Sequence, residues 1–243
     1  MTGMLGLTIN GGFSEYMVAS STVVRKVPDD ISPQEAAPLF CAGATVYGAL
    51  RASDPKPGQW IAIIGIGGLG HLGVQYAKAQ GLKVIAIDNR KEGIDLANDV
   101  PSHLRPDKTY VIDSEEARQK CSDELENGLY DTNPGVDRVV INTEANDLIA
   151  FAQTFTRKGG IIVDVGLPSD NKFVIQPFAL NFKEQTIKGR LICTPEEVSQ
   201  MLELHSKNKC RTHIEKSYNL DQINEMVEHY KSSALKGRLG IAF

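Results

Sequence analysis

Residues 60–70 read Trp-Ile-Ala-Ile-Ile-Gly-Ile-Gly-Gly-Leu-Gly, the segment most informative about the fold. The continuous apolar run over residues 60–64 predicts a strand that is buried on both faces of a parallel sheet. Gly65, Gly67 and Gly70 follow with the spacing GxGxxG at the start of an expected helix. In a dinucleotide-binding turn the first glycine permits the sharp turn, the second lets the backbone approach a diphosphate, and the third lets the helix pack on the strand. The pattern therefore predicts such a turn here.

The acidic residue after the next expected strand supports this interpretation. Asp88 lies roughly 20 residues after Gly70, the usual separation for a carboxylate that binds the adenosine ribose. A carboxylate there repels a 2′-phosphate, so the pattern predicts NAD rather than NADP, although Arg90 could accommodate the additional phosphate. The alternative is a structural glycine-rich turn in which Asp88 only caps the end of the strand.

Strand and helix patterns alternate along the chain on both sides of the glycine turn. We expect strands at 13–19, 23–24, 60–64, 84–87, 110–112, 139–141, 161–163 and 239–243. We expect a helix that Ser32 caps, and further helices at 43–51, 69–80, 114–126, 146–157, 196–206 and 221–232. This alternation is typical of βαβ units with right-handed crossovers. The predicted fold class is α/β, with a Rossmann-type doubly wound parallel sheet over about residues 43–190.

Composition and charge exclude several classes of protein. The chain has 243 residues with 26 basic and 30 acidic side chains, and its net charge of −4 does not favour a nucleic acid or an anionic membrane as partner. No apolar run approaches the ~18 residues of a membrane span, and the first basic residue is Arg25, so no signal peptide is expected. The four cysteines form no CxxC pair, which favours a reducing compartment. We expect a cytoplasmic protein.

Several blocks of sequence carry a resemblance to a known family. The strongest are Ala-Ala-Pro-Leu-Phe-Cys-Ala-Gly-Ala-Thr-Val-Tyr at 36–47 and Gly-Ile-Gly-Gly-Leu-Gly-His-Leu-Gly-Val-Gln-Tyr-Ala-Lys-Ala at 65–79, with weaker matches at 12–16, 159–168 and 236–239. Together these blocks resemble the medium-chain zinc-dependent alcohol dehydrogenases. The resemblance implies NAD-dependent oxidation of a small-molecule alcohol to an aldehyde or ketone, or the reverse reaction.

The resemblance also implies how the chain is divided. Residues 43–190 would form the NAD-binding Rossmann domain. Residues 1–42 would be the remnant of a GroES-like catalytic domain, and residues 191–243 a segment that returns to that domain. Members of the family are commonly oligomers, which suggests a homo-oligomer joined through residues 173–188. Because residues 1–42 would supply only a remnant of the catalytic domain, this segment and residues 191–243 would expose apolar surface.

Individual residues take roles by the same resemblance. Cys41 matches the last protein ligand of a catalytic zinc, and Thr45 matches a residue that lies against the nicotinamide ring. Arg238 matches an arginine that reaches the diphosphate. The other cofactor-binding positions are Gly65, Gly67, Gly68, Leu69 and Gly70 in the glycine turn, Asp88 at the ribose, and Val165 and Leu167 at the carboxamide. The alternatives are a core cysteine at 41 and an exposed charge at 238.

The sequence departs from the family at the metal. It contains no Gly-His-Glu motif and no cysteine quartet, which family members use for the catalytic and structural zinc ions. A catalytic zinc needs three protein ligands and an open position, and Cys41 supplies one of them. We therefore expect a cofactor cradle with an incomplete zinc site. His71 is expected at the start of a helix near the phosphates, not as a metal ligand. The remaining histidines, at 103, 205, 213 and 229, have no metal spacing and are expected at the surface.

Two other functions remain open at this point. One is a zinc-free medium-chain quinone or enoyl reductase, against which Cys41 argues because such enzymes normally lack that cysteine. The other is a non-catalytic polypeptide that binds NAD, either as a truncated product or as the partner of a full-length subunit.

Overall fold

The computed structural model describes residues 8, 11–130, 132–232 and 235–242. Their main feature is a six-stranded sheet in the order β3-β2-β1-β4-β5-β6, in which every neighbouring pair is parallel. This order confirms the predicted doubly wound Rossmann-type sheet. Its strands are β1 (Trp60–Ile64), β2 (Lys83–Asp88), β3 (Lys108–Val111), β4 (Val136–Ile141), β5 (Thr156–Asp164) and β6 (Thr186–Gly189).

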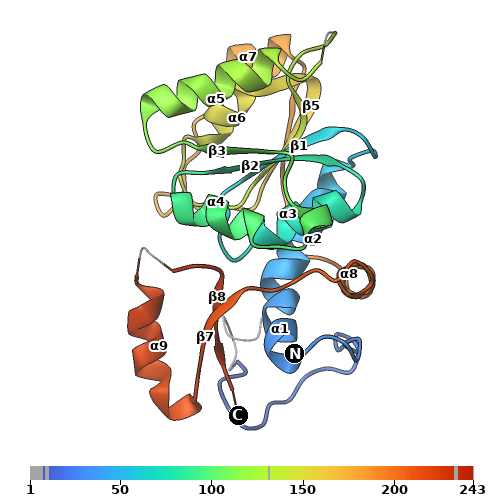
Figure 1. Cartoon of the computed structure of the whole chain (residues 1–243), viewed down its shortest axis with the longest axis vertical. Coiled ribbons are helices and arrows are strands. Elements are labelled where there is room, and N and C mark those ends of the chain that lie inside the picture. The colour runs from blue at the N-terminus through green and yellow to red at the C-terminus, as the bar shows by residue number, and fades with distance from the viewer. Residues whose placement is uncertain (1–7, 9–10, 131, 233–234, 243) are drawn as a thin grey trace.

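Helices cover both faces of this sheet (Figure 1). On one face lie α2 (Ala44–Ser53), α3 (Gly70–Ala79) and α4 (Lys91–Asn98), and on the other α5 (Glu115–Asn127), α6 (Leu148–Phe155) and α7 (Pro177–Phe182). The alternation along β1 shows why both faces are buried. Ile61 and Ile63 pack into the core with α2 and α3, whereas Ala62 and Ile64 pack into the core with α5 and α6. A strand with apolar residues at every position therefore belongs in the centre of the sheet.

Local capping explains where the helix before the sheet begins. The Ser32 hydroxyl accepts a hydrogen bond from the Glu35 amide at 3.3 Å, and Pro33 occupies the first turn of α1 (Pro33–Pro38). These contacts confirm the helix start expected at Ser32. A π-helical turn, η1 (Leu39–Gly43), joins α1 to α2 and carries Cys41.

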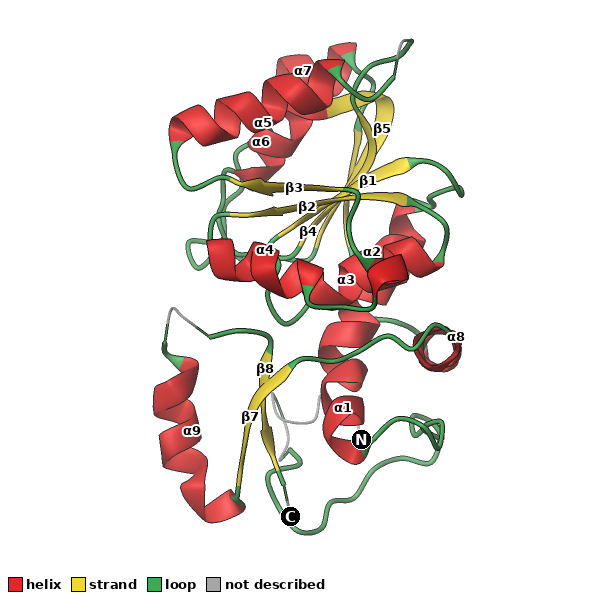
Figure 2. Cartoon of the chain, viewed as in Figure 1, coloured by secondary structure: helices red, strands yellow, loops and turns green. Residues whose placement is uncertain are grey.

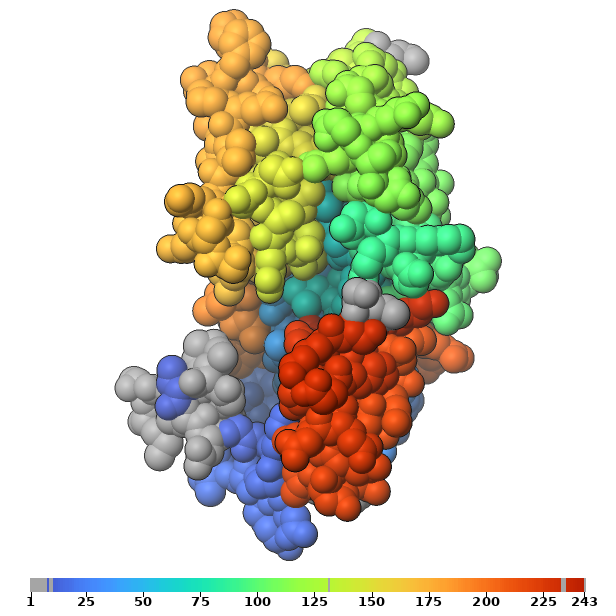
Figure 3. All heavy atoms as spheres, turned by 90° about the vertical axis from the view of Figure 1, so that its left-hand side faces the viewer, coloured from blue at the N-terminus to red at the C-terminus, as the bar shows by residue number. Residues whose placement is uncertain are grey.

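The remaining segments form the lower part of the molecule in Figures 1 and 2. They comprise α8 (Pro195–Lys207), α9 (Ile223–Tyr230), the short helix η3 (Leu220–Gln222), and the strands β7 (Ile214–Tyr218) and β8 (Arg238–Ile241). The short helix η2 (Ser102–Leu104) precedes β3 and packs on α3 in the sheet domain. Strands β7 and β8 form a parallel pair. Figure 3 shows the C-terminal segment in red beside the N-terminal segment in blue, both below the sheet. None of the helices in the described part of the chain is long and apolar enough to cross a membrane.

Some expectations for the elements were wrong. The strands expected at 13–19 and 23–24 do not form: the segment is irregular, and Tyr16 and Val18 are 90% and 92% exposed. Aromatic and β-branched residues favour a strand only where a neighbouring strand accepts their hydrogen bonds, and here no described strand does. No sequence pattern predicted α4, α7, β6 or β7. Position 243, the end of the last expected strand, lies outside the described residues.

One histidine expected at the surface is buried. His205 on α8 is 2% exposed, and its Nδ1 lies 3.1 Å from the Tyr76 hydroxyl on α3. Burial lowers the pKa of His205 to about 4, so the ring is neutral near pH 7. The helix α8 therefore docks on α3 through a neutral polar contact, which sequence spacing could not reveal.

Candidate dinucleotide-binding site

The glycine turn after β1 has the geometry that its spacing predicts. Gly65 has φ of +85°, a conformation that residues with a side chain rarely adopt, and its N–H donates to the Ile87 carbonyl at 2.8 Å. A Cβ atom at Gly70 would overlap the carbonyl oxygen of Gly65, so the helix approaches the turn as closely as glycine allows. At Gly67, by contrast, a Cβ atom would meet no heavy atom within 4 Å. The backbone at Gly67 is thus open to a ligand.

Helix α3 starts directly at this turn. Leu69 is its N-cap residue, and no side chain makes a capping hydrogen bond there. The first N–H groups of a helix have no partner within the helix and carry the positive end of its dipole. The start of α3 is therefore suited to bind an anion such as a diphosphate.

Asp88 is held at the end of β2 and contacts the glycine turn. Its side chain is 4% exposed. Oδ2 accepts a hydrogen bond from the Ile66 amide at 2.6 Å, and Oδ1 accepts one from the Arg90 amide at 2.8 Å. The Arg90 Nε atom lies 3.5 Å from Oδ1. Because each carboxylate oxygen can accept more than one hydrogen bond, both retain capacity for the hydroxyls of a ribose.

A cavity of about 510 Å³ lies at the carboxyl ends of β1, β2 and β4. Its lining includes Gly65, Gly67, Asp88 and Asn142. This is the crevice where the strand order reverses, the usual ligand position in open α/β sheets. Both amide atoms of Asn142 are buried without a hydrogen-bond partner among the described residues. Buried polar atoms are normally paired, so this amide has a free donor and a free acceptor for a polar group that enters the cavity.

Arg238 also reaches the glycine turn, although it is far away in sequence. A Cβ atom at Gly68 would overlap the Arg238 Nε, so the guanidinium lies directly against the backbone of the turn. The side chain is partly buried, and its Nε has no described hydrogen-bond partner. The structure thus brings together Arg238 and the expected diphosphate-binding backbone, and the role of Arg238 remains a prediction.

The other expected site residues lie on neighbouring elements. Cys41 is an exposed free thiol on η1, and Thr45 is partly exposed in the first turn of α2. Val165 follows β5, and its N–H donates to the Ile141 carbonyl at 3.0 Å, so only its carbonyl remains for a ligand. Leu167 is 77% exposed. Their expected contacts with a nicotinamide and a metal stay predictions.

The described residues do not complete a zinc site. Within the described part of the chain, no group of three or more His, Cys, Asp or Glu side chains is arranged to hold a metal ion. A catalytic zinc needs three protein ligands, so Cys41 with its described neighbours does not fit this ion. A dinucleotide does fit, because the open Gly67 backbone, the buried Asp88 and the unpaired Asn142 amide face one cavity.

Comparison with known proteins agrees with this architecture. The profile of a family described as zinc-binding dehydrogenase matches residues 68–207, which is more than half of the chain. The chain belongs to this zinc-binding dehydrogenase family. The match begins within the glycine turn and extends through α8.

Three similar proteins illustrate the relationship. An alcohol dehydrogenase of Geobacillus stearothermophilus is 34% identical over 236 residues, which are 96% of this chain and 65% of that protein. The structure of the alcohol dehydrogenase of Aeropyrum pernix has a TM-score of 0.82 and 29% identity, covering 98% of this chain and 67% of that one. The acetophenone reductase of Geotrichum candidum, solved with NAD, has a TM-score of 0.79 and 26% identity, covering 96% and 63%. The present zinc-binding dehydrogenase chain thus spans about two thirds of the length of these relatives.

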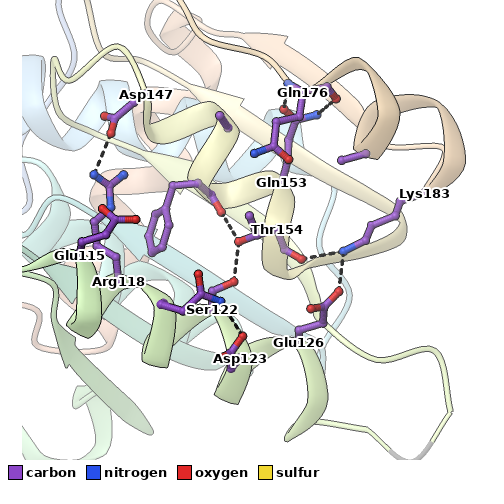
Figure 4. A pocket seen from close by; sticks show the side chains of 14 residues that line it. Glu115, Arg118, Ser122, Asp123, Glu126, Asp147, Gln153, Thr154, Gln176 and Lys183 are labelled. Carbon is purple, nitrogen blue, oxygen red and sulfur yellow. Dashed lines mark hydrogen bonds and ion pairs between the residues drawn. The ribbon is translucent and has the colours of Figure 1, made fainter.

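A second hollow, of about 560 Å³, lies between α5, α6 and α7 (Figure 4). It shares Arg118 and Asp147 with the first cavity, and these two side chains form an ion pair at 2.7 Å. Lys183 pairs with Glu126 at 3.0 Å. Because these charges neutralise one another, we assign no ligand to this hollow.

Asn142, which lines the first cavity, was not among the site residues expected from the sequence. Its place directly after a buried strand could have indicated it, because strand ends line the crevice.

Proposed function

We propose that this chain binds NAD in the cavity at the carboxyl ends of β1, β2 and β4. The observation that carries the proposal is the open backbone at Gly67 beside the buried carboxylate of Asp88. The diphosphate would contact the backbone from Gly65 to Gly70, including Gly68 and Leu69, at the start of α3. Asp88 would accept hydrogen bonds from the ribose hydroxyls and disfavour a 2′-phosphate, so that NAD is preferred to NADP.

We further propose that the activity is that of an NAD-dependent alcohol dehydrogenase acting on a small-molecule alcohol or aldehyde. The resemblance in sequence and the alcohol dehydrogenases among its relatives support this proposal. Bound NAD supplies a hydride acceptor, or in its reduced form a donor. Thr45 would position the nicotinamide ring, Val165 and Leu167 its carboxamide, and Arg238 the diphosphate. Cys41 would correspond to one zinc ligand of the family, and the described residues do not supply the other ligands that a catalytic zinc needs.

We propose the same division of the chain that the resemblance implies. Residues 43–190, which contain the whole parallel sheet, would be the NAD-binding domain. Residues 1–42 and 191–243 would belong to a catalytic domain. We also propose a cytoplasmic protein without a nucleic-acid or membrane partner, in line with its modest net charge of −4.

A homo-oligomer is supported by an apolar surface next to the edge strand β6. We define the α7 surface as Phe173, Val174, Ile175, Phe178 and Phe182, whose side chains are between 42% and 72% exposed. Phe178 and Phe182 stack with ring centroids 4.1 Å apart. Exposed apolar surfaces of this kind mark sites of association, and an uncovered edge strand offers free backbone groups to a second copy.

The test of NAD binding uses two matched glycine variants. Gly67→Ala adds a methyl group where the protein has room but the diphosphate should lie, whereas Gly189→Ala adds one at the outer strand β6, also in open space. We expect the Gly67 variant to bind NADH at least about tenfold more weakly in a fluorescence titration, a loss of about 1.4 kcal/mol. Gly189→Ala should bind like the unmodified protein. Equal NADH affinity in both variants would contradict the proposed site.

Metal content and turnover distinguish the alternatives. Bound NADH together with NAD-linked alcohol turnover supports the dehydrogenase. Binding without turnover favours a non-catalytic NAD-binding chain or the partner of a full-length subunit. Reduction of a quinone or an enone by the zinc-free protein favours the medium-chain reductase. One tightly bound zinc per chain in elemental analysis would contradict the expected incomplete zinc site.

A further inference from the structure

His71 is a buried side chain to which the proposed function assigns no role. It lies in the first turn of α3 and is 1% exposed. Its Nδ1 is 2.9 Å from the carbonyl oxygen of Gly67, and its Nε2 accepts a hydrogen bond from the His213 amide at 3.2 Å. One imidazole ring therefore contacts both the glycine turn and the segment that leads into β7.

The same segment holds the strand that carries Arg238. The Arg238 amide donates to the His213 carbonyl at 3.0 Å. At Gly237, where φ is +69°, a Cβ atom would overlap that carbonyl oxygen, so the start of β8 is held closely against residue 213. A continuous series of hydrogen bonds thus runs from the carbonyl of Gly67 through His71 and His213 to the backbone of Arg238.

The bonding partners determine the state of the His71 ring. A carbonyl oxygen only accepts and a backbone amide only donates, so the ring must carry its proton on Nδ1 and leave Nε2 free to accept. Burial lowers the pKa of His71 to about 4, and the nearby His213 and Arg238 act in the same direction, although the bond to Gly67 opposes them. A neutral ring makes both hydrogen bonds at once, whereas a protonated ring would lose the bond from His213.

We propose that His71 is a positioning residue for the diphosphate: by bridging Gly67 and His213 it holds the glycine turn and Arg238 at the spacing at which both can contact the same diphosphate. This inference rests on the proposed NAD binding. The guanidinium already lies against Gly68, and its buried Nε has no hydrogen-bond partner among the described residues. A misplacement of β8 relative to the glycine turn would move Arg238 away from the turn, so that the two could no longer contact the same diphosphate.

A neighbouring contact provides the control. One turn further along α3, the Gln75 side chain makes two hydrogen bonds to the backbone of Arg211, at 2.8 and 2.9 Å. Gln75 therefore docks the same segment on α3. Its Nε2 also donates to the His71 carbonyl at 3.0 Å, but no described hydrogen bond connects its side chain to residues 65–70. A variant of Gln75 loosens the docking in general, whereas a variant of His71 also releases Gly67.

The experiment compares a ligand that contains the diphosphate with one that lacks it. The affinities for ADP-ribose and for adenosine are measured by calorimetry and by NMR titration. We expect His71→Leu to weaken ADP-ribose binding about tenfold, because a loss of this size corresponds to one charge-assisted contact. Adenosine binding should change less than about twofold. Gln75→Leu should weaken ADP-ribose binding clearly less. In an Arg238→Ala background the additional effect of His71→Leu should vanish.

Two partial variants test the bridge itself and remain informative if the leucine variant does not fold. His71→Asn places an amide near the position of Nδ1 and can keep the bond to Gly67, whereas His71→Gln reaches the position of Nε2 and can keep the bond to His213. Both should lose ADP-ribose affinity, because neither makes both bonds. Unchanged ADP-ribose affinity, or an equal loss for adenosine, would overturn the positioning role. If the unmodified protein binds neither NADH nor ADP-ribose, the proposed function itself fails and this inference with it.

Discussion

At the scale of single residues, Asp88 joins the sheet to the glycine turn. Its two oxygens accept hydrogen bonds from the amides of Ile66 and Arg90. The carboxylate therefore has a fixed position, and it lines the cavity proposed to bind the ribose. Selectivity between NAD and NADP should depend on this charge more than on Arg90, whose guanidinium lies beside it.

The corresponding prediction concerns Asp88→Ser. Removal of the negative charge should raise the affinity for NADPH relative to NADH by about tenfold or more, because repulsion of the 2′-phosphate disappears. The two dissociation constants are measured by fluorescence titration. Asp95→Ser on α4 removes one negative charge from an exposed ion pair with Lys91 and serves as the control. An unchanged NADH to NADPH ratio in the Asp88 variant would remove Asp88 from this role.

Asp164, at the end of β5, leads to a prediction about stability and pH. Burial raises its pKa from 3.8 to about 6, although a hydrogen bond from the Gly166 amide opposes the shift. Since the folded protein holds this proton more tightly than the unfolded chain, the group favours folding below about pH 4 and loses that contribution as the pH rises through 6. At pH 7.5 the buried charge should cost about 3 kcal/mol.

Asp164→Asn should therefore raise the free energy of unfolding by about that amount at pH 7.5 and change it little at pH 4. Denaturant unfolding at both pH values measures the difference. The opposite pattern, with a gain only at acid pH, would show that the carboxylate is paired in the folded state.

At the scale of elements, two glycines in the turn between β1 and α3 should have different roles, one in stability and NADH affinity and the other in NADH affinity alone. Gly70→Ala should reduce both stability and NADH affinity, because its methyl group overlaps the carbonyl of Gly65 and moves the helix away from the turn. We expect a loss of about 1–3 kcal/mol in the free energy of unfolding. Gly67→Ala, in the same turn, should reduce only the NADH affinity. If Gly70→Ala unfolds at the same denaturant concentration as the unmodified protein, the close contact is not required.

The sequence predicted elements well where a local pattern is long and unambiguous. Strand β1 was predicted at its observed bounds, because a continuous apolar run can only be buried on both faces. Helix α4 was missed since its eight residues include four polar or charged ones and follow a strand without a capping side chain. Strand β7 was missed because β8 is its one partner among the described strands and because it exposes Glu215 and Lys216.

At the scale of the whole molecule, the exposed α7 surface precedes β6, which is an edge strand of the sheet. Phe178→Glu combined with Phe182→Glu should convert an oligomer into a smaller species, because buried charge opposes association. Sedimentation velocity measures this change. The control is Phe13→Glu, which alters an exposed aromatic residue in the N-terminal segment (62% exposed). An unmodified protein that sediments as a monomer would contradict the proposed interface.

The parallel α/β sheet, the glycine turn and the carboxylate after it could be predicted from local patterns, since each depends on residues close together in the chain. Only the folded chain shows that His213 and Arg238 meet this turn through His71, that His205 is buried against Tyr76, and that the Asn142 amide faces the cavity unpaired. The difference lies in the range of the interactions. Periodicity and turn chemistry act over a few residues, whereas the docking of the C-terminal segment depends on hydrogen bonds between residues more than 100 positions apart.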